Sequence, residues 1–193
     1  SFIGILGKTG SGKTTLANIL AKFYAIPNGK IFFNNIDTND IERKSFYEKF
    51  AYVMQDDYIY DNTIKHNIEL YKSYEKNEVK EATEKAELFD TIEKLDKKYN
   101  TLIGDNGIKL SGGQKQRLIL SRNLITNPNI LIIDNGFTGL DIDTRKKVID
   151  NLNNRNNKTT LVIISSMIED IKNADKIYKL ENKALVEINM EED

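Results

Sequence analysis

A lysine and a threonine end a glycine-rich stretch near the start of the chain, Gly7-Lys8-Thr9-Gly10-Ser11-Gly12-Lys13-Thr14. The apolar run Phe2–Leu6 before it predicts a buried strand, and residues 16–23 after it predict a helix. A strand, a glycine loop and a helix in this order can cradle phosphate, because glycines let backbone N–H groups point inward and the helix adds its positive end. The predicted phosphate-binding residues are Thr9, Gly10, Ser11, Gly12, Lys13, Thr14 and Thr15.

Two side chains of this loop predict which phosphate compound it binds. Lys13 would neutralise the β- and γ-phosphates of a nucleotide, and the Thr14 hydroxyl would help to hold Mg²⁺. If the glycine turn only linked two core elements, Lys13 and Thr14 would serve no purpose in packing. The loop therefore favours a nucleotide with Mg²⁺ over a purely structural turn.

Length and composition exclude several classes of protein. A chain of 193 residues, 39% hydrophobic and 30% charged, can form one substantial globular domain, or one domain with a small subdomain. It has no apolar run near the ~20 residues that cross a bilayer. The 28 basic and 29 acidic residues are interspersed, which gives no basic face for nucleic acid. The lack of cysteine excludes disulfides and thiolate metal sites.

Short apolar runs and helical periodicity alternate along the chain. After the first helix we expect strands at 30–33, 51–54, 130–133, 160–164, 176–180 and 185–188. Helices are expected at 63–70, 77–98, 143–152 and 167–173, and another runs from the segment 110–117 through Ile125. This alternation predicts an α/β fold with a mainly parallel sheet flanked by helices, and together with the glycine loop it resembles the P-loop NTPase type. We expect residues 1–55 and 126–193 to form the P-loop core and residues 56–125 an α-helical subdomain.

A second motif, Leu110-Ser111-Gly112-Gly113-Gln114-Lys115-Gln116-Arg117, opens one of these helices. It matches the signature of ABC transporter nucleotide-binding domains residue for residue, and nearly the whole chain resembles that family. The resemblance implies a head-to-tail dimer in which the signature of one domain closes over ATP on the glycine loop of the other. A Ser-Gly-Gly turn at a helix N-terminus also has free N–H donors for an anion. The residues expected to contact ATP in trans are Ser111, Gly112, Gly113 and Gln114.

Three more positions match motifs of the family. Gln55 follows an expected strand, as does the family's glutamine loop, which contacts Mg²⁺ and water and faces the transmembrane part. Asp134 ends an apolar strand, where a carboxylate that organises Mg²⁺ through bound water belongs. Thr138-Gly139-Leu140-Asp141 matches the loop that crosses the dimer interface. The resemblance thus implies ATP and Mg²⁺ as cofactors, with Thr14, Gln55 and Asp134 at the metal.

Two segments resemble the exporter branch of the family. Residues 101–107, Thr-Leu-Ile-Gly-Asp-Asn-Gly, stand where exporters have a threonine and Gly-Glu-Arg-Gly facing the coupling helices, although Asp105 and Asn106 depart from that pattern. Residues 55–68, which include Asp56, also resemble the exporter sequence. Within them, Tyr58 and Tyr60 could equally contact a coupling helix or pack inside the helical subdomain.

Two residues depart from the family where ATP is cleaved. Asn135 replaces the glutamate that polarises the attacking water, and an amide cannot accept the proton, a step worth ~10² to 10⁴-fold in rate. Ser165 and Ser166 replace a threonine and a histidine, and Ser166 is too short to reach the γ-phosphate as the histidine does. We therefore assign Gln55, Asn135 and Ser166 to catalytic positions and expect slow hydrolysis at this loop. Two independent departures in one site favour a naturally degenerate site. Asn135 alone could instead be an engineered substitution that traps bound ATP.

Such a site resembles the impaired partner of heterodimeric exporters, which keeps an intact signature for the other subunit. The resemblance implies a second nucleotide-binding domain as partner, a heterodimer being favoured over a homodimer, and an exporter's transmembrane domain at the cytoplasmic face of a membrane. Two alternatives stay open. One is a regulatory module that binds ATP without hydrolysis. The other is a soluble ABC ATPase, which would call for a coiled-coil insertion, a tandem domain or a basic face.

The chain has only Ser1 ahead of the first expected strand. We therefore expect a piece of a longer protein, trimmed at the N-terminus. In the family, the aromatic residue that stacks on adenine lies upstream of the glycine loop. Its loss would weaken binding of the base, since stacking of an aromatic pair contributes about 0.5 to 1.5 kcal/mol.

Overall fold

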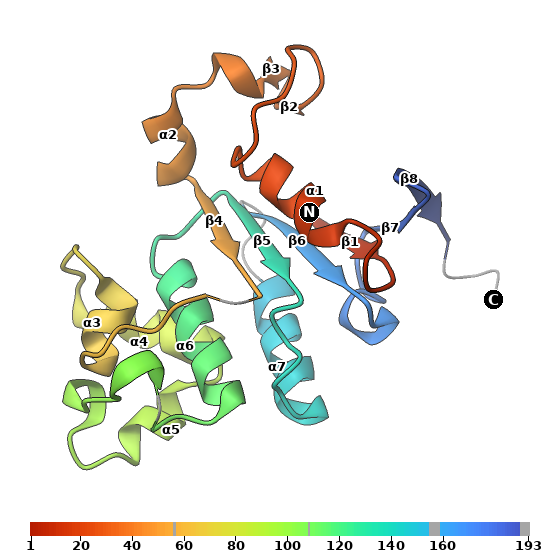
Figure 1. Cartoon of the computed structure of the whole chain (residues 1–193). Coiled ribbons are helices and arrows are strands. Elements are labelled where there is room, and N and C mark those ends of the chain that lie inside the picture. Colours follow the sequence, from red (N-terminus) through yellow and green to blue (C-terminus); the bar gives the residue numbers. More distant parts are fainter. Residues whose placement is uncertain (56, 108, 155–158, 190–193) are drawn as a thin grey trace. The chain divides into compact units, whose positions relative to one another are not determined.

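The computed structural model describes the chain except for residues 56, 108, 155–158 and 190–193 (Figure 1). The described residues belong to two compact units. The first comprises residues 1–52 and 128–134 and the described part of 158–193, and the second comprises residues 53–127 and the described part of 135–157. The described residues between 135 and 154 thus group with the helical unit, whereas the sequence assigned this segment to the P-loop core.

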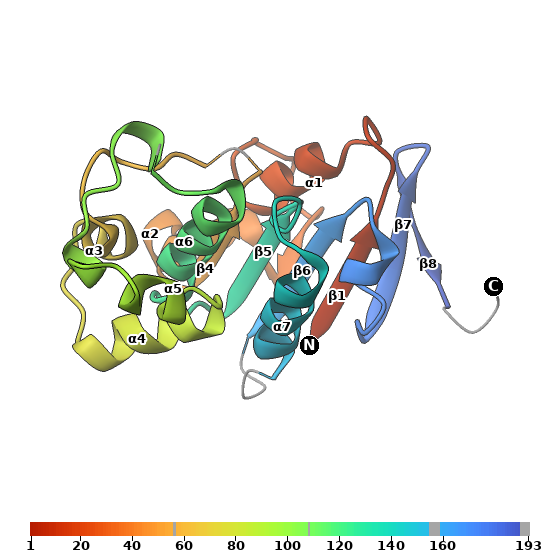
Figure 2. The same ribbon diagram turned by 90° about the horizontal axis from the view of Figure 1, so that it is seen from below.

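A six-stranded sheet organises the first unit, in the order β4-β5-β6-β1-β7-β8 (Figure 2). The strands are β1 (Phe2–Leu6), β4 (Phe50–Val53), β5 (Ile130–Asp134), β6 (Thr160–Ser165), β7 (Lys176–Glu181) and β8 (Ala184–Ile188). Parallel pairs join β5 to β6, β6 to β1 and β1 to β7, while β8 is antiparallel to β7. The predicted mainly parallel α/β sheet is confirmed, and each expected strand in it lies within one or two residues of its predicted bounds.

Helix α1 (Lys13–Leu20) packs on one face of this sheet. Ala17 and Ala21 are fully buried against sheet residues such as Ile132 and Val162. The helix begins three residues before its predicted start, because the lysine and threonine of the glycine loop form its first turn. It ends early because Lys22 has a left-handed backbone with φ 58°.

Strands β2 (Phe32–Phe33) and β3 (Ile36–Asp37) form a small antiparallel hairpin. In the sequence, this hairpin comes before β4, which is an edge strand of the large sheet. Asn34 and Asn35 make its two-residue turn with φ 49° and 65°, a conformation that asparagine tolerates well. The 3₁₀ helix Thr38–Asp40 and α2 (Arg43–Glu48) follow. The polar stretch before α2 therefore includes a short strand.

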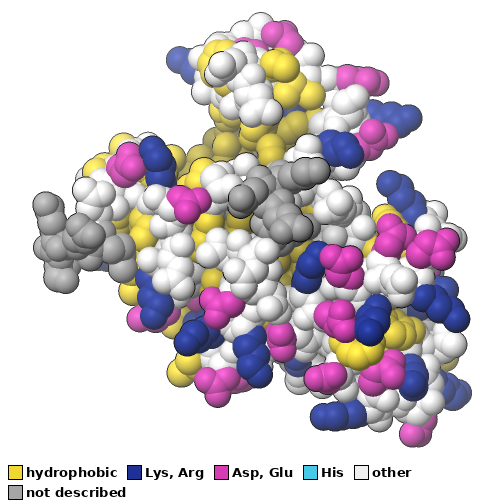
Figure 3. Space-filling model, turned by 180° about the vertical axis from the view of Figure 1, so that it is seen from behind, with side chains coloured by type: hydrophobic (Ala, Val, Ile, Leu, Met, Phe, Trp, Pro, Cys, Tyr) yellow, Lys and Arg dark blue, Asp and Glu magenta, His cyan; other side chains and the backbone are white. Residues whose placement is uncertain are grey.

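The second unit is helical, as expected for the middle third of the chain. Its helices are α3 (Ile64–Glu69), α4 (Lys76–Lys85), α5 (Phe89–Glu93), α6 (Gly112–Leu124) and α7 (Ile142–Asn153). The single helix expected at 77–98 is wrong, because Glu87 has φ 57° and interrupts it between α4 and α5. Basic and acidic side chains lie interspersed on the face of the molecule that Figure 3 shows. Among the described helices, none is long and apolar enough to cross a bilayer.

Two shorter expectations need correction as well. The helix predicted at 167–173 is only a 3₁₀ turn, Ile168–Asp170, since the buried Asp170 bonds back to the strand before it. Another 3₁₀ turn, Lys98–Asn100, follows α5 where the sequence predicted continued α-helix. At both places the apolar residues have helical spacing. A side-chain hydrogen bond or a 3₁₀ turn nevertheless keeps the backbone from forming a longer α-helix.

We predict that the centre of β6 dominates the stability of the first unit. Ile163 is 1% exposed, so Ile163→Ala should lower the free energy of unfolding by about 2 to 5 kcal/mol through lost burial and a cavity. Val186→Ala in β8 is the matched control, because Val186 is 49% exposed and should cost less than ~0.5 kcal/mol. Urea denaturation of the two variants measures both values, and equal losses would contradict this view of the core.

Candidate functional site

The backbone of the glycine loop adopts conformations that require glycine. Gly10 and Gly12 have φ 81° and 98°, a left-handed region that other residues avoid. Gly7 is required for a different reason, since a Cβ there would lie 2.5 Å from the Ser11 hydroxyl oxygen. Gly7 N–H also donates to the Ser165 carbonyl at 3.1 Å, which fixes the start of the loop to the end of β6.

The interior of this loop fits an anion. Lys13 is only 6% exposed, and its Nζ donates to the carbonyls of Gly7 and Lys8 at 2.9 and 3.0 Å. The Ser11 hydroxyl is buried and makes no hydrogen bond to the described part of the chain. A buried polar group without a partner costs free energy, so a bound oxyanion would satisfy this hydroxyl and draw on the ammonium group.

The first turn of α1 meets the carboxyl end of β5. Thr14 Oγ1 donates to Asp134 Oδ2 at 2.6 Å, although the two residues are 120 positions apart in the sequence. Asp134 is fully buried. A hydroxyl and a carboxylate are the oxygen ligands that Mg²⁺ prefers, so these two predicted metal-site residues fit that ion.

Tyr52 and Asn18 also belong to this cluster, although the sequence did not single them out. The Tyr52 hydroxyl donates to Asn18 Oδ1 at 3.2 Å. Burial, followed by the negative charge of Asp134, raises the pKa of the Tyr52 phenol above its ordinary value. One signal was available: Asn18 stands four residues after Thr14, on the same face of α1.

Ser165 and Ser166 end β6 at the same edge of the sheet. Ser165 is buried; its hydroxyl donates to Asp170 Oδ2 at 2.6 Å and accepts from the Met167 N–H at 3.0 Å. Ser166 is exposed. Ser165 therefore shapes the turn after β6, and Ser166 is the one of the pair whose side chain is accessible.

Gln55 and Asn135 lie together in the second unit. Asn135 Nδ2 donates to Gln55 Oε1 at 3.4 Å, a long hydrogen bond. Asn135 has φ 49°, and asparagine is one of the few residues that adopts this left-handed backbone readily. The residue next to Gln55, Asp56, lies outside the described residues.

The signature motif begins α6 with a complete capping box. Ser111 Oγ accepts from the Gln114 N–H at 3.3 Å, and Gln114 Oε1 accepts from the Ser111 N–H at 2.9 Å. Gly113 must be glycine, because a Cβ there would lie 2.7 Å from the Gly139 carbonyl oxygen. A Cβ at Gly112 would meet no neighbouring atom, so this position is open.

The loop 138–141 packs against the signature helix. Gln116 holds it twice, accepting from the Gly139 N–H at 2.8 Å and donating to Thr138 Oγ1 at 3.1 Å. Asp141 then caps α7, since its Oδ1 accepts from the Thr144 N–H at 2.9 Å. Two motifs that the sequence separates by more than 20 residues are thus one structural element.

A buried arginine holds the segment that follows Gln55. Arg122 of α6 is 8% exposed, and its guanidinium donates to the carbonyls of Asn67 and Tyr58 at 2.7 and 2.8 Å. The Asp57 carboxylate lies 3.6 Å away. Tyr58 itself is 52% exposed and donates to Asp105 Oδ1 at 3.1 Å. The Tyr58 ring therefore lies at the surface, while the Tyr58 carbonyl is held by the buried Arg122.

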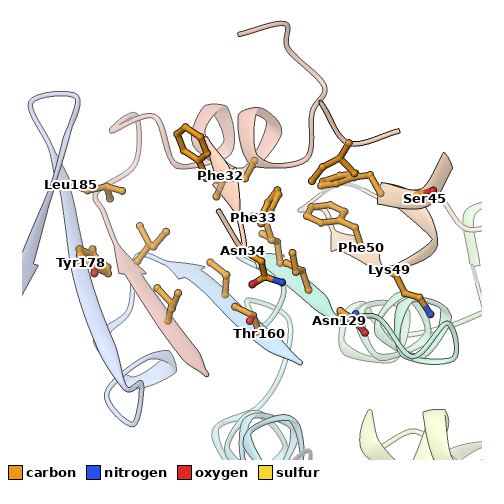
Figure 4. A pocket seen from close by; sticks show the side chains of 18 residues that line it. Phe32, Phe33, Asn34, Ser45, Lys49, Phe50, Asn129, Thr160, Tyr178 and Leu185 are labelled. Carbon is orange, nitrogen blue, oxygen red and sulfur yellow. The ribbon is translucent and has the colours of Figure 1, made fainter. Parts of the chain in front are cut away.

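A cavity of about 620 Å³ lies elsewhere in the first unit (Figure 4). It is mainly apolar, with Phe32, Phe33, Phe46 and Phe50 among its walls. Figure 3 shows the same hollow beneath the lobe of β2, β3 and α2. None of the predicted site residues lines it.

With this geometry in place, comparisons with known proteins identify the family. Residues 1–138 match the sequence family described as ABC transporter. The chain belongs to the ABC transporter family. More specifically, it is an ABC transporter ATP-binding domain with exporters among its relatives.

Two curated relatives and one solved structure show the extent of the similarity. The ATP-dependent lipid A-core flippase of Photorhabdus laumondii is 34% identical over 188 residues, which cover 96% of this chain and 32% of that protein. The beta-(1→2)glucan export ATP-binding/permease protein NdvA of Bartonella bacilliformis is 38% identical over 186 residues, covering 96% and 31%.

The solved structure is that of a bacterial Atm1-family ABC exporter with ATP bound. It is 31% identical, with a TM-score of 0.90, and the match covers 96% of this chain and 33% of that one. The chain therefore spans about one third of the length of the relatives it matches. The predicted ABC fold is confirmed by this similarity.

We predict that the Asp141 cap gives α7 a pH-dependent stability. The hydrogen bond from the Thr144 N–H lowers the pKa of Asp141 below its ordinary value of 3.8, so the stabilisation is complete above that pH and is lost as the pH falls through the lower folded value. Asp141→Asn keeps an oxygen for the cap but has no charge to lose. Its free energy of unfolding should therefore fall less steeply than that of the wild type between pH 5 and pH 3, measured by urea denaturation. Parallel slopes would contradict this role.

Proposed function

We propose that this chain is the ATP-binding motor domain of an exporter, which binds Mg-ATP in its glycine loop and dimerises head to tail with a second such domain. The observation that carries the proposal is the 2.6 Å contact between Thr14 and Asp134 beside a loop with a buried lysine. This arrangement supplies backbone donors, one cation and two metal-binding oxygens at one place. Together these match the chemistry of a triphosphate with its metal ion.

Each residue of the loop then has a distinct task. Residues 9–15 hold the phosphates through their backbone N–H groups, and Lys13 turns its ammonium from the loop carbonyls towards the β- and γ-phosphates. Thr14, Asp134 and Gln55 orient the metal and its water. When bound, Mg²⁺ neutralises the charge on the phosphate oxygens.

Hydrolysis at this loop is expected to be slow. Asn135 stands where a general base is needed, and its amide can orient a water but cannot take its proton. Ser166 is accessible but short, which leaves the γ-phosphate without the contact that a histidine makes. The half-site therefore holds ATP more than it cleaves it.

The other half of the proposed activity lies in the signature. The capped N-terminus of α6 offers N–H groups to a nucleotide bound by the partner domain, through Ser111, Gly112 and Gly113. Gln114 supports this turn from within the capping box, and Asp141 belongs to the loop at the dimer interface. A partner with an intact glutamate would complete a working site, which favours a heterodimer.

We further propose that this domain lies at the cytoplasmic face of a membrane, joined to a transmembrane part of an exporter. The relatives at 34% and 38% identity, named for lipid A-core flipping and glucan export, support it. The exposed Tyr58 and its bond to Asp105 mark the surface expected to face coupling helices. A regulatory module without turnover is the alternative, and the partner's sequence separates the two.

Nucleotide binding tests the central claim. We expect the affinity for Mg-ATP to fall about tenfold or more in Lys13→Met, because the loop loses its buried cation. Lys8→Met is the matched control, since Lys8 is an exposed lysine of the same loop and should leave the affinity unchanged. Isothermal titration calorimetry measures all three dissociation constants. A Lys13 variant that binds as tightly as the wild type would refute the assignment.

A second experiment tests the impaired half-site. Asn135→Glu should raise ATP hydrolysis by the chain mixed with a signature-bearing partner by about 10²-fold or more, because it restores a base. Asn135→Gln, which has the same length and backbone demands but no basic group, should stay at the wild-type rate. Phosphate release under single-turnover conditions is the measurement. Robust release by the purified wild-type chain alone would contradict the impairment.

A further inference from the structure

The signature helix and the loop 138–141 approach each other through glycine backbone. A Cβ on Gly113 would lie 2.7 Å from the Gly139 carbonyl oxygen, and a Cβ on Gly139 would lie 3.3 Å from the Gly112 carbonyl carbon. This approach leaves no room for larger residues, but glycine has no side chain that could hold the two segments together. Thr138 and Gly139 are exposed, so water competes for their polar groups. A side chain that bonds across the approach would therefore hold the loop in place.

Gln116 is such a side chain. Its Oε1 accepts from the Gly139 N–H at 2.8 Å, and its Nε2 donates to Thr138 Oγ1 at 3.1 Å. A backbone N–H can only donate, so these two contacts fix which amide atom faces which partner. At this position asparagine would be shorter by a methylene, glutamate would lack the donor, and lysine or arginine would lack the acceptor. The two bonds thus need both groups of a glutamine amide.

The hydrogen bonds of the loop continue beyond Gln116. The Thr138 hydroxyl, which accepts from Gln116, donates in turn to the Asn135 carbonyl at 3.5 Å, a long contact. At the other end of the loop, Asp141 Oδ1 accepts from the Thr144 N–H at 2.9 Å. The loop is therefore anchored at both ends within the second unit, to the signature helix by Gln116 and to α7 by Asp141.

We propose that Gln116 is a positioning residue for the dimer interface: its amide fixes the loop 138–141 to the signature turn, so that both meet the partner's bound nucleotide as one surface. This inference rests on the proposed function, because it concerns the same head-to-tail contact. A loop that is already held in place loses less freedom when the partner binds. A glutamine that only stabilised the fold would instead change the free energy of unfolding and leave turnover by the folded chain unaltered.

Amide hydrogen exchange tests whether Gln116 holds the loop. Gln116→Met keeps the length of the side chain but removes its acceptor and its donor. In the chain alone, exchange at the Gly139 N–H should become about tenfold faster or more, because this group loses its acceptor. Asn123→Leu is the matched control, since Asn123 lies on the same helix and its side chain donates to the Ile119 carbonyl at 2.9 Å. NMR measures the exchange rates, and equal rates in the wild type and Gln116→Met would overturn the positioning role.

Turnover tests the consequence in the Asn135→Glu background, where two copies of the chain can complete each other's sites. Added to that variant, Gln116→Met should lower kcat about tenfold while the KM for Mg-ATP stays within about twofold, because the glycine loop is unchanged. Asn123→Leu should change neither constant. Steady-state phosphate release gives both constants, and urea denaturation checks that the compared chains are folded.

The possible results separate the two claims. If Asn135→Glu binds Mg-ATP but hydrolyses it no faster than the wild type, the head-to-tail activity of the proposed function is overturned, and amide exchange at Gly139 still decides whether Gln116 holds the loop. If Asn135→Glu is active, the role of Gln116 is overturned by a Gln116→Met variant with an unchanged kcat, or by one whose KM rises as much as its kcat falls.

Discussion

The pairing of β6 with both β5 and β1 is the constraint on which the first unit's site depends. Its register sets Leu6 beside Ser165 and Asp134 beside Ile164, so three strands end at one edge. The glycine loop leaves this edge from β1, the acidic residue ends β5, and the serine turn ends β6. A shift of one residue in either pairing would turn Asp134 away from Thr14, because neighbouring residues of a strand face opposite sides. The chemistry of the site is therefore set by backbone hydrogen bonds far from any ligand.

Much of this arrangement was predictable from the sequence, for a physical reason. Buried parallel strands are apolar along their length and glycine loops have fixed spacing, so β1, β5, β6 and the loop could be located closely. The interruption at Glu87 could not, because a positive φ at a glutamate leaves no sign in the apolar spacing around it. Tyr52 was missed because a tyrosine in an apolar strand reads as packing until its hydroxyl has a partner.

The signature was recognised from its letters, but the reason for some of them came only from the structure. Gly113 is needed for the close approach of Gly139, and Gln114 is needed for the capping box with Ser111. Gln116 ties the same helix to the loop 138–141. Contacts between segments distant in sequence decide these roles, and spacing along the chain carries no information about them. The motif is therefore a packing unit in its own right, besides the nucleotide-binding role that we propose for it.

The left-handed backbone at Asn135 limits how this domain can change over evolutionary time. Asparagine accepts φ 49° readily, whereas a glutamate there carries a penalty of roughly 1 kcal/mol. A single reversion to the family's glutamate would thus meet both a strained backbone and the missing histidine at position 166. Under the proposed function, the backbone at this position therefore favours the asparagine that holds ATP over the glutamate that would cleave it, independently of any contact with the nucleotide.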